Sequence, residues 1–494
     1  MAWGATSRFL YREFILLPQI ATGFLPLVPL RGLAGEALEF AKRAYVMTAG
    51  FALFLMDAIA IALFWPLTIR LAGTPIGFLQ AITFALLDLG FIYALGLYRR
   101  DSISELEKTL RRVPLVTALS VAASCLMAAG LHWNISLALC AAAIACFAGC
   151  AVIARAVFAQ LRRHSLFRSR LLVIGAGKRA WDLLQVLRNQ GRHLQYDMTF
   201  VHEDSFGSID QRLADDPRNQ IVLASSNLLE LAERVRADQI VVAPDDRRGM
   251  TLESLITCRA NGYPVVQYMS FLEKEISRID IKRLDMSWML YSDGFHVSPL
   301  GSGLKRIFDI IASAMILTAF SPVLLLAMVA VWAGDRKAIF YRQERVTRGG
   351  RSFRILKLRT MQTNAEAGGA VWAAAGDSRV TPVGKFLRRS RIDELPQLFN
   401  VLAGDMSLVG PRPERPEFIE HLAKQLPLYH ERHAVKAGLT GWAQVNYPYG
   451  ASLDDARSKL SYDLYYVKNY NILFDLKIVM QTLRVVMWAG SDAR

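Results

Sequence analysis

Residues 305–337 read KRIFDIIASAMILTAFSPVLLLAMVAVWAGDRK, an apolar segment that carries basic residues at both ends. The segment is long enough to cross the roughly 30 Å hydrocarbon core of a bilayer. Lys305 and Arg306 precede the apolar run, and Arg336 and Lys337 follow it. Because Lys and Arg beside membrane segments favour the cytoplasmic side, we expect both ends of this segment to stay there.

The centre of this segment contains Ser321-Pro322. Proline cannot donate its helical hydrogen bond and clashes with the preceding turn, so a kink is expected there. We therefore predict a re-entrant helix over 305–334, which enters the inner leaflet, bends at Pro322 and returns. The alternative is an ordinary kinked transmembrane helix, which would place the C-terminal third of the chain outside.

Four more apolar segments precede this one, at 44–65, 77–97, 113–131 and 135–158. Each is about 20 residues long, which is the length of a membrane span. Lys and Arg cluster before the first segment, between the second and third, and after the fourth, whereas the other two loops have almost none. We predict four membrane helices with both ends in the cytoplasm, and a soluble bundle is the alternative. Asp57 and Asp88, which lie inside these segments, are expected to serve helix packing.

The whole chain of 494 residues is 53% hydrophobic and 20% charged, yet its formal net charge is +15. Its length suggests about three domains, and ordinary globular domains carry about a quarter charged residues. Disordered proteins are excluded because they are poor in apolar residues, and five cysteines are too few for a disulfide scaffold. Nucleic acid, anionic lipid and phosphorylated substrates could each explain the basic excess, and only its position can decide among them.

From residue 168, short apolar runs alternate with helix-like segments, a pattern typical of βαβ units and a parallel, Rossmann-like sheet. The predicted strands and helices lie at 171–174, 221–224, 240–243 and 265–267, and at 228–236 and 252–260, respectively. Gly175 and Gly177 open a partial G-x-G-x-x-G turn after the first strand, with alanine at the third glycine position. Such a turn brings backbone N–H groups close to a phosphate. Nucleotide binding and a Rossmann-like domain without it both remain open.

The C-terminal third contains a dense basic run between residues 342 and 359. Its members are Arg342, Arg345, Arg348, Arg351, Arg354, Lys357 and Arg359. Gly349-Gly350 interrupts the run and predicts a turn between two strands. The run follows the membrane-embedded segment, where lipid phosphates are concentrated, although a solvated basic face is the alternative.

An adjacent pair of carboxylates, Asp393 and Glu394, lies in the sequence GKFLRRSRIDELPQL at 384–398. Neighbouring carboxylates suit nucleophilic attack at phosphorus and the binding of Mg²⁺, because the preceding cations keep them ionised and neutralise the transferred group. Further along the chain, a stiff proline-flanked turn, Gly410-Pro411-Arg412-Pro413, presents one guanidinium suited to a bidentate phosphate contact.

Several motifs together resemble the bacterial sugar transferases, which are monotopic polyprenyl-phosphate phosphoglycosyl transferases. The motifs are Lys305-Arg306-x-x-Asp309, Ser321-Pro322, Arg342-Gln343-Glu344-Arg345-Val346, Lys357-x-Arg359-Thr360-Met361, Arg391-x-Asp393-Glu394-Leu395-Pro396-Gln397-Leu398-x-Asn400-Val401, Ser407-Leu408-Val409-Gly410-Pro411-Arg412-Pro413 and Lys436-x-Gly438-Leu439-Thr440-Gly441-Trp442-Ala443-Gln444-Val445-Asn446. The resemblance covers roughly residues 302–490. Together with the apolar segments and the Rossmann-like part, the chain is similar to the large membrane form, such as undecaprenyl-phosphate glucose or galactose phosphotransferases.

The resemblance implies a chemical role for each matching residue. Asp393 would attack the β-phosphorus of a UDP-sugar, release UMP and form a sugar-phosphoryl aspartate, from which undecaprenyl phosphate would take the sugar phosphate. Glu394, with Asp393, would hold Mg²⁺. The implied substrate-binding residues are Lys357, Arg359, Arg388, Pro411, Arg412 and Pro413. The implied residues of the re-entrant helix are Lys305, Arg306, Asp309, Ser321 and Pro322.

The resemblance also implies the architecture and the partners. We expect a cytoplasmic segment at 1–44, a membrane α-helical four-helix unit at 45–158, an α/β Rossmann-like middle domain at 168–290, and an α+β catalytic domain with the re-entrant helix at 302–494. The protein would lie in the bacterial inner membrane with its catalytic domain facing the cytoplasm. It would start exopolysaccharide, capsule or O-antigen synthesis. We expect it to form a homodimer and to work with downstream glycosyltransferases, and we expect no nucleic-acid partner.

Two departures from the family pattern leave the identity of the sugar open. The family usually has Lys-Pro-Gly where this chain has Lys436-Ala437-Gly438, and Asn-Gly where it has the sequence NYPYG at 446–450. A second enzyme class, a membrane-bound nucleotide-sugar dehydratase or epimerase, needs a Tyr-x-x-x-Lys motif that none of the 16 tyrosines provides. A non-enzymatic membrane scaffold would explain the charge but not the carboxylate pair. The aromatic segment 462–488 fits an interfacial helix or a core helix equally well.

Overall fold

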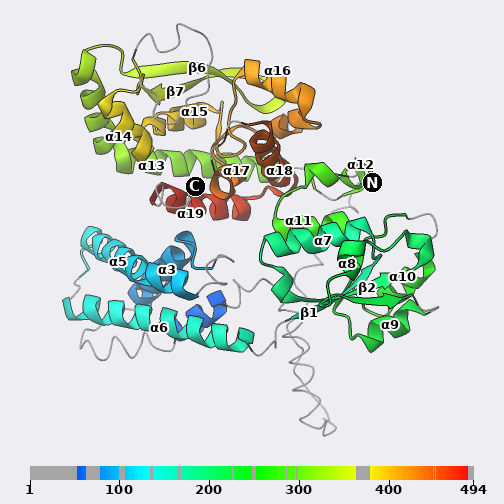
Figure 1. Ribbon diagram of the computed structural model, residues 1–494. Helices are drawn as coiled ribbons and strands as arrows, with labels where there is room; N and C mark the ends of the chain where they lie inside the picture. The colour runs from blue at the N-terminus through cyan, green and yellow to red at the C-terminus, as the bar shows by residue number, and fades with distance from the viewer. Residues whose placement is uncertain are drawn as a thin grey trace, which may run out of the picture. The chain divides into compact units, whose positions relative to one another are not determined.

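The structure is a computed structural model (Figure 1). It describes residues 53–62, 78–98, 106–133, 137–163, 168–224, 227–246, 252–284, 286–292, 294–295, 299–362, 379–448, 450 and 452–487. The expected N-terminal segment 1–44 and parts of the first two expected membrane segments lie outside these residues.

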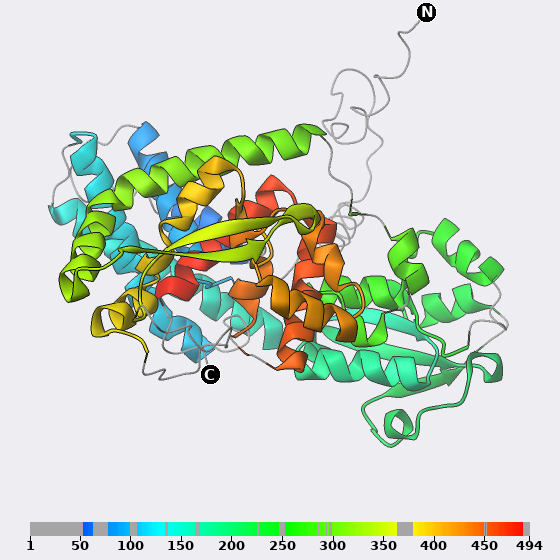
Figure 2. The same cartoon turned by 90° about the horizontal axis from the view of Figure 1, so that it is seen from above.

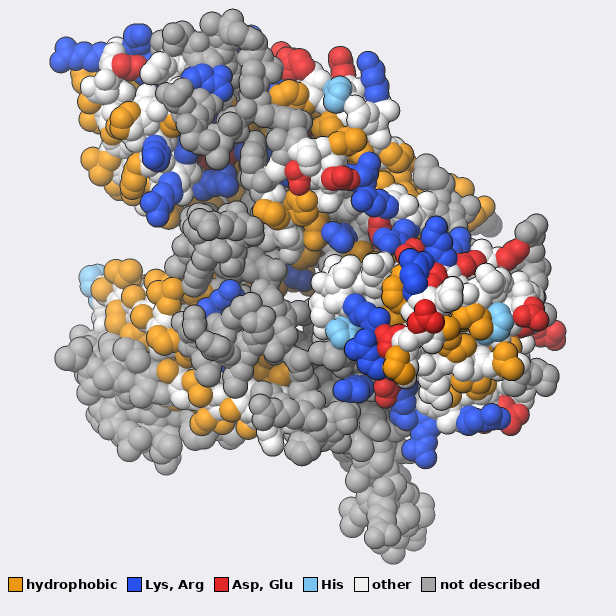
Figure 3. Space-filling model, viewed as in Figure 1, with side chains coloured by type: hydrophobic (Ala, Val, Ile, Leu, Met, Phe, Trp, Pro, Cys, Tyr) orange, Lys and Arg blue, Asp and Glu red, His pale blue; other side chains and the backbone are white. Residues whose placement is uncertain are grey.

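The N-terminal third forms apolar helices where the sequence predicts them. They are Leu53–Ala62, α3 (Phe78–Ala94), α5 (Leu106–Gly130) and α6 (Leu137–Arg163). Among the described residues, two helical stretches are long and apolar enough to cross a membrane, Arg112–Gly130 in α5 and Pro299–Asp335 in the C-terminal part. Figure 3 shows hydrophobic side chains exposed over α5 and α6, whereas charged side chains are mixed over the β-sheet part of the chain.

Asp57 and Asp88 are both buried among these helices. Asp57 accepts hydrogen bonds from Arg155 of α6 at 2.9 Å and from the hydroxyl of Tyr98, which follows α3, at 2.7 Å. A buried carboxylate is tolerated when it is paired in this way. The contact links three segments of the chain, as the predicted packing role requires.

The middle part of the chain forms a five-stranded parallel sheet with the strand order β3-β2-β1-β4-β5. The strands are β1 (Ser169–Ile174), β2 (Tyr196–His202), β3 (Gln220–Leu223), β4 (Gln239–Val242) and β5 (Val265–Gln267). The helices are α7 (Lys178–Asn189), α8 (Gln211–Ala214), α9 (Leu228–Arg234), α10 (Leu252–Ala260) and α11 (Tyr268–Ile276). The predicted βαβ pattern is confirmed, and β2 is a strand that the sequence analysis missed.

Both faces of this sheet are buried. Leu171 and Val173 of β1 pack into one cluster with α7, while Leu172 and Ile174 pack into another with Leu231 of α9. Side chains alternate between the two faces of a strand. A strand covered on both faces therefore reads as a continuous apolar run, which is why the sequence predicts β1 and β4.

The C-terminal part combines helices with two small sheets. The helices are α12 (Met286–Tyr291), α13 (Pro299–Asp335), α14 (Pro382–Ser390), α15 (Gln397–Ala403), α16 (Pro416–Gln425), α17 (Trp442–Asn446), α18 (Leu453–Asn469) and α19 (Ile472–Met487). Antiparallel β6 (Phe340–Val346) and β7 (Ser352–Leu358) form one sheet, and parallel β8 (Ser407–Val409) and β9 (Gly438–Thr440) form the other. Gly349 and Gly350 both have positive φ between β6 and β7, which confirms the predicted turn.

Helix α13 contacts the C-terminal part along both of its halves. Phe308, in its first half, packs beside Leu398 of α15, whereas Leu324 and Val331, in its second half, pack against Leu387 of α14. Figures 1 and 2 both show a helix that changes direction along its length. Pro322 lies inside it.

Candidate active site

Asp393 and Glu394 lie on a tight connection between α14 and α15. Helix α14 ends at Ser390 and is capped by Arg391, whose φ of 59° is left-handed, and a 3₁₀ turn over Ile392–Glu394 leads on towards α15. A Cβ on Gly384 would lie 2.1 Å from the carbonyl oxygen of Thr360, so only glycine lets α14 approach the end of β7 this closely. The backbone therefore fixes where both carboxylates project.

The Asp393 carboxylate is buried, with 8% of the residue exposed. Its Oδ1 atom has no hydrogen-bond partner among the described residues. Burial and the adjacent charge of Glu394 raise the pKa of Asp393 to about 6, although Lys357, Arg388 and Arg391 oppose the rise. A carboxylate that is ionised near neutral pH, with one oxygen unpaired among the described residues, is suited to act as a nucleophile.

Glu394 has the opposite surroundings, because three cations meet at its Oε1 atom. Arg412 lies at 3.3 Å, Lys357 at 3.5 Å and Arg391 at 3.6 Å. Burial alone would raise the pKa of Glu394, but these cations lower it to about 2. Glu394 is therefore ionised at every physiological pH and holds Arg412 and Lys357 beside Asp393.

The turn that carries Arg412 is fixed by its backbone, because three successive carbonyl groups accept hydrogen bonds. The donors are the N–H of Gly438 to Pro411 (2.9 Å), the guanidinium of Arg432 to Arg412 (3.0 Å) and the guanidinium of Arg345 to Pro413 (3.1 Å). A guanidinium on a restrained turn loses less freedom when it binds a phosphate.

Arg432 and Asp463 form a buried ion pair at 2.8 Å that supports this turn, and the sequence analysis missed both residues. Arg432 lies in a 3₁₀ segment, Tyr429–Ala434, and Asp463 lies in α18. The signal that could have revealed them is Asp463, the one charged residue in the sequence LSYDLYYV at 460–467, since a buried charge requires a partner.

The other predicted substrate-binding residues divide into two groups. Lys357, Arg388 and Arg412 gather around the carboxylate pair, and Nε of Arg388 is held by Oγ1 of Thr360 at 2.9 Å. Arg359 instead pairs with Asp335 at the end of α13. Arg359 thus links β7 to α13.

The predicted residues at the start of α13 dock this helix onto α15, β8 and α19. Arg306 donates to the carbonyl oxygens of Val401 and Leu402, at 2.6 and 2.7 Å, and so satisfies the C-terminal end of α15. Lys305 pairs with buried Asp475 and also reaches the carbonyl oxygen of Val409.

Asp309 of α13 accepts a hydrogen bond from the N–H of Leu408 at 3.1 Å. Further along α13, the hydroxyl of Ser321 donates to the carbonyl oxygen of Thr318 at 2.9 Å. Pro322 has no N–H with which to reach that carbonyl, so Ser321 replaces the missing donor.

The two departures from the family pattern are both tied into the structure. The buried N–H of Ala437 donates to Oγ1 of Thr347 at 3.1 Å, a bond that proline could not make. Asn446 bonds the carbonyl oxygen of Trp442, and Tyr447 bonds Asp455. Among the described residues, no group of three or more His, Cys, Asp or Glu side chains could hold a metal ion.

The glycine turn at 175–177 is closed by a carboxylate of the chain itself. The N–H groups of Lys178 and Arg179 donate to the two oxygens of Asp245, at 2.7 and 2.8 Å. A Cβ on Gly177 would lie 2.2 Å from Oδ2 of Asp245, and a Cβ on Gly175 would lie 2.6 Å from the carbonyl oxygen of Ala243. Both glycines are therefore needed for close approach to the segment after β4.

Comparison with known proteins gives one family model, described as bacterial sugar transferase, which matches residues 300–489. A UDP-N-acetylgalactosamine-undecaprenyl-phosphate N-acetylgalactosaminephosphotransferase from Aeromonas hydrophila is 40% identical over 53% of this chain and 61% of its own length. A UDP-glucose:undecaprenyl-phosphate glucose-1-phosphate transferase from Klebsiella pneumoniae is 31% identical over 67% of this chain and 70% of its own length. One of the same name from Caulobacter vibrioides is 41% identical over 36% of this chain and 68% of its own length.

The chain thus spans less than two thirds of the Aeromonas relative but more than two thirds of the other two. The match to the family model includes α13, both carboxylates and the Arg412 turn. These relatives give no support to the dehydratase, epimerase or scaffold alternatives. The chain belongs to the bacterial sugar transferase family.

Proposed function

We propose that this protein transfers a hexose-1-phosphate from a UDP-sugar to undecaprenyl phosphate, giving UMP and an undecaprenyl-diphosphate sugar. The names of the relatives support these two substrates. The observation that carries the proposal is the carboxylate of Asp393, which is buried and lacks a partner at Oδ1 among the described residues. The reaction would be the first membrane step of exopolysaccharide, capsule or O-antigen synthesis.

The proposed reaction proceeds in two steps through Asp393. Its carboxylate attacks the β-phosphorus of the UDP-sugar, and UMP leaves with the electrons of the broken P–O bond. A phosphate oxygen of undecaprenyl phosphate then attacks the same phosphorus and releases the carboxylate. The charge that develops in both steps is stabilised by Arg412 and Lys357, which Glu394 holds in place.

Mg²⁺ is part of this proposal. Mg²⁺ is commonly bound by one or two carboxylates together with substrate phosphates. The unpaired Oδ1 of Asp393 and the ionised Glu394 fit that pattern, so these two residues would hold the ion. When bound, Mg²⁺ would neutralise negative charge on the diphosphate.

We also propose that α13 is the re-entrant helix and that it brings the site to the membrane surface. The contacts of its two ends support this topology, since Arg306 near one end and Asp335 at the other both bind the same part of the chain. Large apolar side chains between these ends are exposed, among them Ile307, Met315, Leu325, Leu326 and Val329. The protein would lie in the inner membrane with four N-terminal spans and its catalytic part in the cytoplasm, as a homodimer that passes its product to glycosyltransferases.

The test is UMP release from a panel of UDP-sugars, including UDP-glucose, UDP-galactose and UDP-N-acetylgalactosamine, with and without polyprenyl phosphate. Asp393→Asn is expected to lower the rate to background, because an amide is not a nucleophile. The Asp405→Asn variant, which changes a carboxylate outside the pair, is expected to retain activity.

A second readout tests the covalent step. Without acceptor, mass spectrometry of the protein treated with the active UDP-sugar should show a sugar-phosphate adduct at Asp393. Near-native transfer by Asp393→Asn would reject the covalent mechanism, and no UMP release from any UDP-sugar would reject the proposed reaction.

A further inference from the structure

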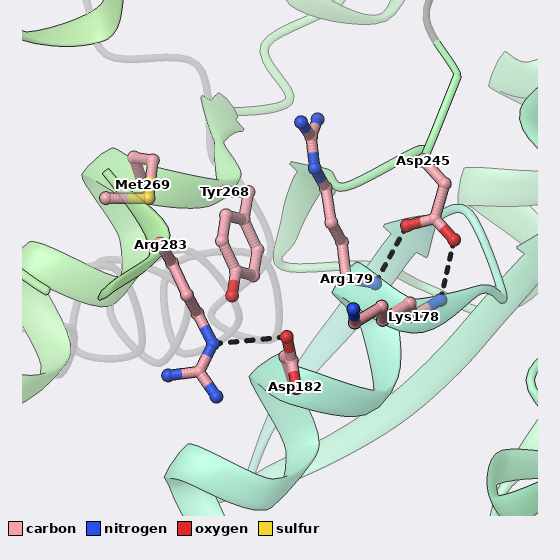
Figure 4. Close-up of a pocket in the computed structure, with 7 residues that line it drawn as sticks. All are labelled: Lys178, Arg179, Asp182, Asp245, Tyr268, Met269 and Arg283. Atoms are coloured by element: carbon pink, nitrogen blue, oxygen red, sulfur yellow. Dashed lines mark hydrogen bonds and ion pairs between the residues drawn. The ribbon is translucent and has the colours of Figure 1, made fainter. Parts of the chain in front are cut away.

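A cavity of about 440 Å³ lies in the β-sheet part of the chain, apart in sequence from the residues around Asp393. Figure 4 shows its lining, which comprises Lys178, Arg179, Asp182, Asp245, Tyr268, Met269 and Arg283. Its volume is in the range of pockets that bind small organic ligands, about 300–1,000 Å³. It is much larger than a single inorganic anion requires.

The cavity lies where the strand order reverses. Strands β2 and β3 lie on one side of β1, and β4 and β5 lie on the other. Lys178 begins the helix after β1, Asp245 follows β4, and Tyr268 begins the helix after β5. In open α/β sheets, ligands bind outside the carboxyl ends of the strands at such a reversal.

One side of the cavity holds an anion that belongs to the chain. Both oxygens of Asp245 accept backbone N–H groups at the start of α7, as Figure 4 shows. This position at a helix N-terminus is where bound phosphates are found in other α/β proteins. The carboxylate of Asp245 therefore occupies the place of a ligand phosphate.

The other side of the cavity contains a buried hydroxyl that no described residue bonds. Tyr268 is 4% exposed, and its hydroxyl makes no hydrogen bond among the described residues. In Figure 4 this hydroxyl points toward the side of the cavity where Arg283 pairs with Asp182, at 3.1 Å. Burial raises the pKa of Tyr268, so the hydroxyl keeps its proton and can donate. A buried polar group without a partner is unfavourable until a ligand supplies one.

The charges around the cavity favour an anionic ligand. Lys178, Arg179 and Arg283 supply positive charge against Asp182 and Asp245. If the carboxylate of Asp245 moves away, the two N–H groups of α7 become available beside Lys178 and Arg179. The thioether of Met269 and the ring of Tyr268 provide an apolar surface suited to a nucleobase.

We propose that this cavity binds a nucleoside diphosphate. A phosphate of this ligand displaces the Asp245 carboxylate from the start of α7, and the part of the ligand that lies inside the cavity accepts a hydrogen bond from the Tyr268 hydroxyl. The site is a second nucleotide site, additional to the one around Asp393. The proposal concerns binding alone, and no chemical step is assigned to this site.

The test is calorimetric titration of the full-length protein in detergent with UDP, ADP and inorganic phosphate. The titrations use a protein that carries Arg412→Ala, so that nucleotide binding around Asp393 is weakened and the heat reports binding in the cavity. One nucleoside diphosphate is expected to bind per chain. Tyr268→Phe should weaken this binding about two- to tenfold, the effect of one lost hydrogen bond, whereas Tyr263→Phe, outside the cavity lining, should leave it unchanged.

A substitution of Asp245 tests the displacement directly, and its expected effect on nucleotide affinity is opposite to that of Tyr268→Phe. Asp245→Ala removes the competing carboxylate and should tighten nucleotide binding severalfold. Asp245→Asn, which keeps an acceptor for the α7 N–H groups, provides a second variant if the first does not fold. The proposal is overturned if neither nucleotide binds, if phosphate binds as tightly as both nucleotides, or if the folded Asp245 and Tyr268 variants bind like the parent.

Discussion

Asp393 and Glu394 are neighbours in the sequence but occupy contrasting electrostatic surroundings. The 3₁₀ turn directs Asp393 into a buried position, where Oδ1 has no partner in the described part of the chain, and directs Glu394 toward three cations. Their pKa values are therefore separated, at about 6 and about 2. Such a separation suits two carboxyl groups with different tasks, which in the proposed mechanism are nucleophilic attack for Asp393 and the positioning of the cations for Glu394.

The pH dependence of the reaction should report Asp393. Below about pH 6 its carboxyl is protonated and cannot attack, so kcat/KM for UMP release should fall about tenfold for each further pH unit. Arg391→Ala should move this acid limb to higher pH, because the Arg391 charge lowers the pKa of Asp393. Arg389→Ala, in the same basic stretch, is the matched control and should leave the limb in place. An acid limb near pH 4 in the parent protein would contradict the assignment.

Which residues the sequence could reveal depends on whether they are adjacent along the chain. The carboxylate pair and the Arg412 turn are local patterns, so the sequence predicts them. The support of Arg412 by Arg432 and Asp463 depends on tertiary packing between segments far apart along the chain. No spacing rule connects such residues, although the buried charge of Asp463 is a hint.

At the scale of elements, the Arg412 turn depends on one buried ion pair, and its loss should be costly. Arg432→Ala leaves Asp463 buried without its partner and frees the carbonyl of Arg412. Removing one partner of a buried pair costs about 3–5 kcal/mol. The thermal unfolding midpoint should therefore fall, and KM for the UDP-sugar should rise as the turn loosens.

The exposed pair of Arg457 with Asp454 on α18 provides the control for this prediction. Surface pairs contribute about 0–1 kcal/mol, so Arg457→Ala should change the unfolding midpoint little. Equal midpoints for the two variants would show that the Arg432 pair does not support the turn.

The elements that the sequence predicts well are those with a strong local signal. Strands β1 and β4 each contain a continuous apolar run, at 171–174 and 240–242, whereas β2 places Asp197 and Thr199 among its apolar residues. The sequence analysis treated the aromatic segment 462–488 as one helix, yet its described residues belong to two helices, α18 and α19. The break is marked by Asn471, whose side chain accepts the N–H of Phe474 as a helix cap does. That cap is a signal that the sequence analysis could have used.

At the scale of the whole molecule, the basic excess gathers at two kinds of place. Some of it flanks apolar segments, as Lys305 and Arg336 do. Another part surrounds the carboxylate pair, where Lys357 and Arg412 contact Glu394. Both places suit phosphate, in lipid head groups or in a diphosphate, so the net charge of +15 does not require a nucleic-acid partner.

The re-entrant topology proposed for α13 makes a prediction about both of its ends. In a chain whose five native cysteines are replaced, Gly303→Cys and Arg336→Cys place a thiol at either end of the apolar run. A Cβ at Gly303 meets no atom within 4 Å, and Arg336 is exposed. Because basic residues flank both ends, an impermeant maleimide should label both thiols in inverted membrane vesicles and neither in intact spheroplasts.

His132→Cys provides the control for this topology, because His132 is exposed after α5, in a loop expected to face outward. It should be labelled in spheroplasts. If Gly303→Cys and Arg336→Cys react from opposite sides, α13 crosses the bilayer and the re-entrant model is wrong. In that case Arg306 and Arg359, which hold the two ends of α13 to the same part of the chain, could not keep both contacts across roughly 30 Å of hydrocarbon.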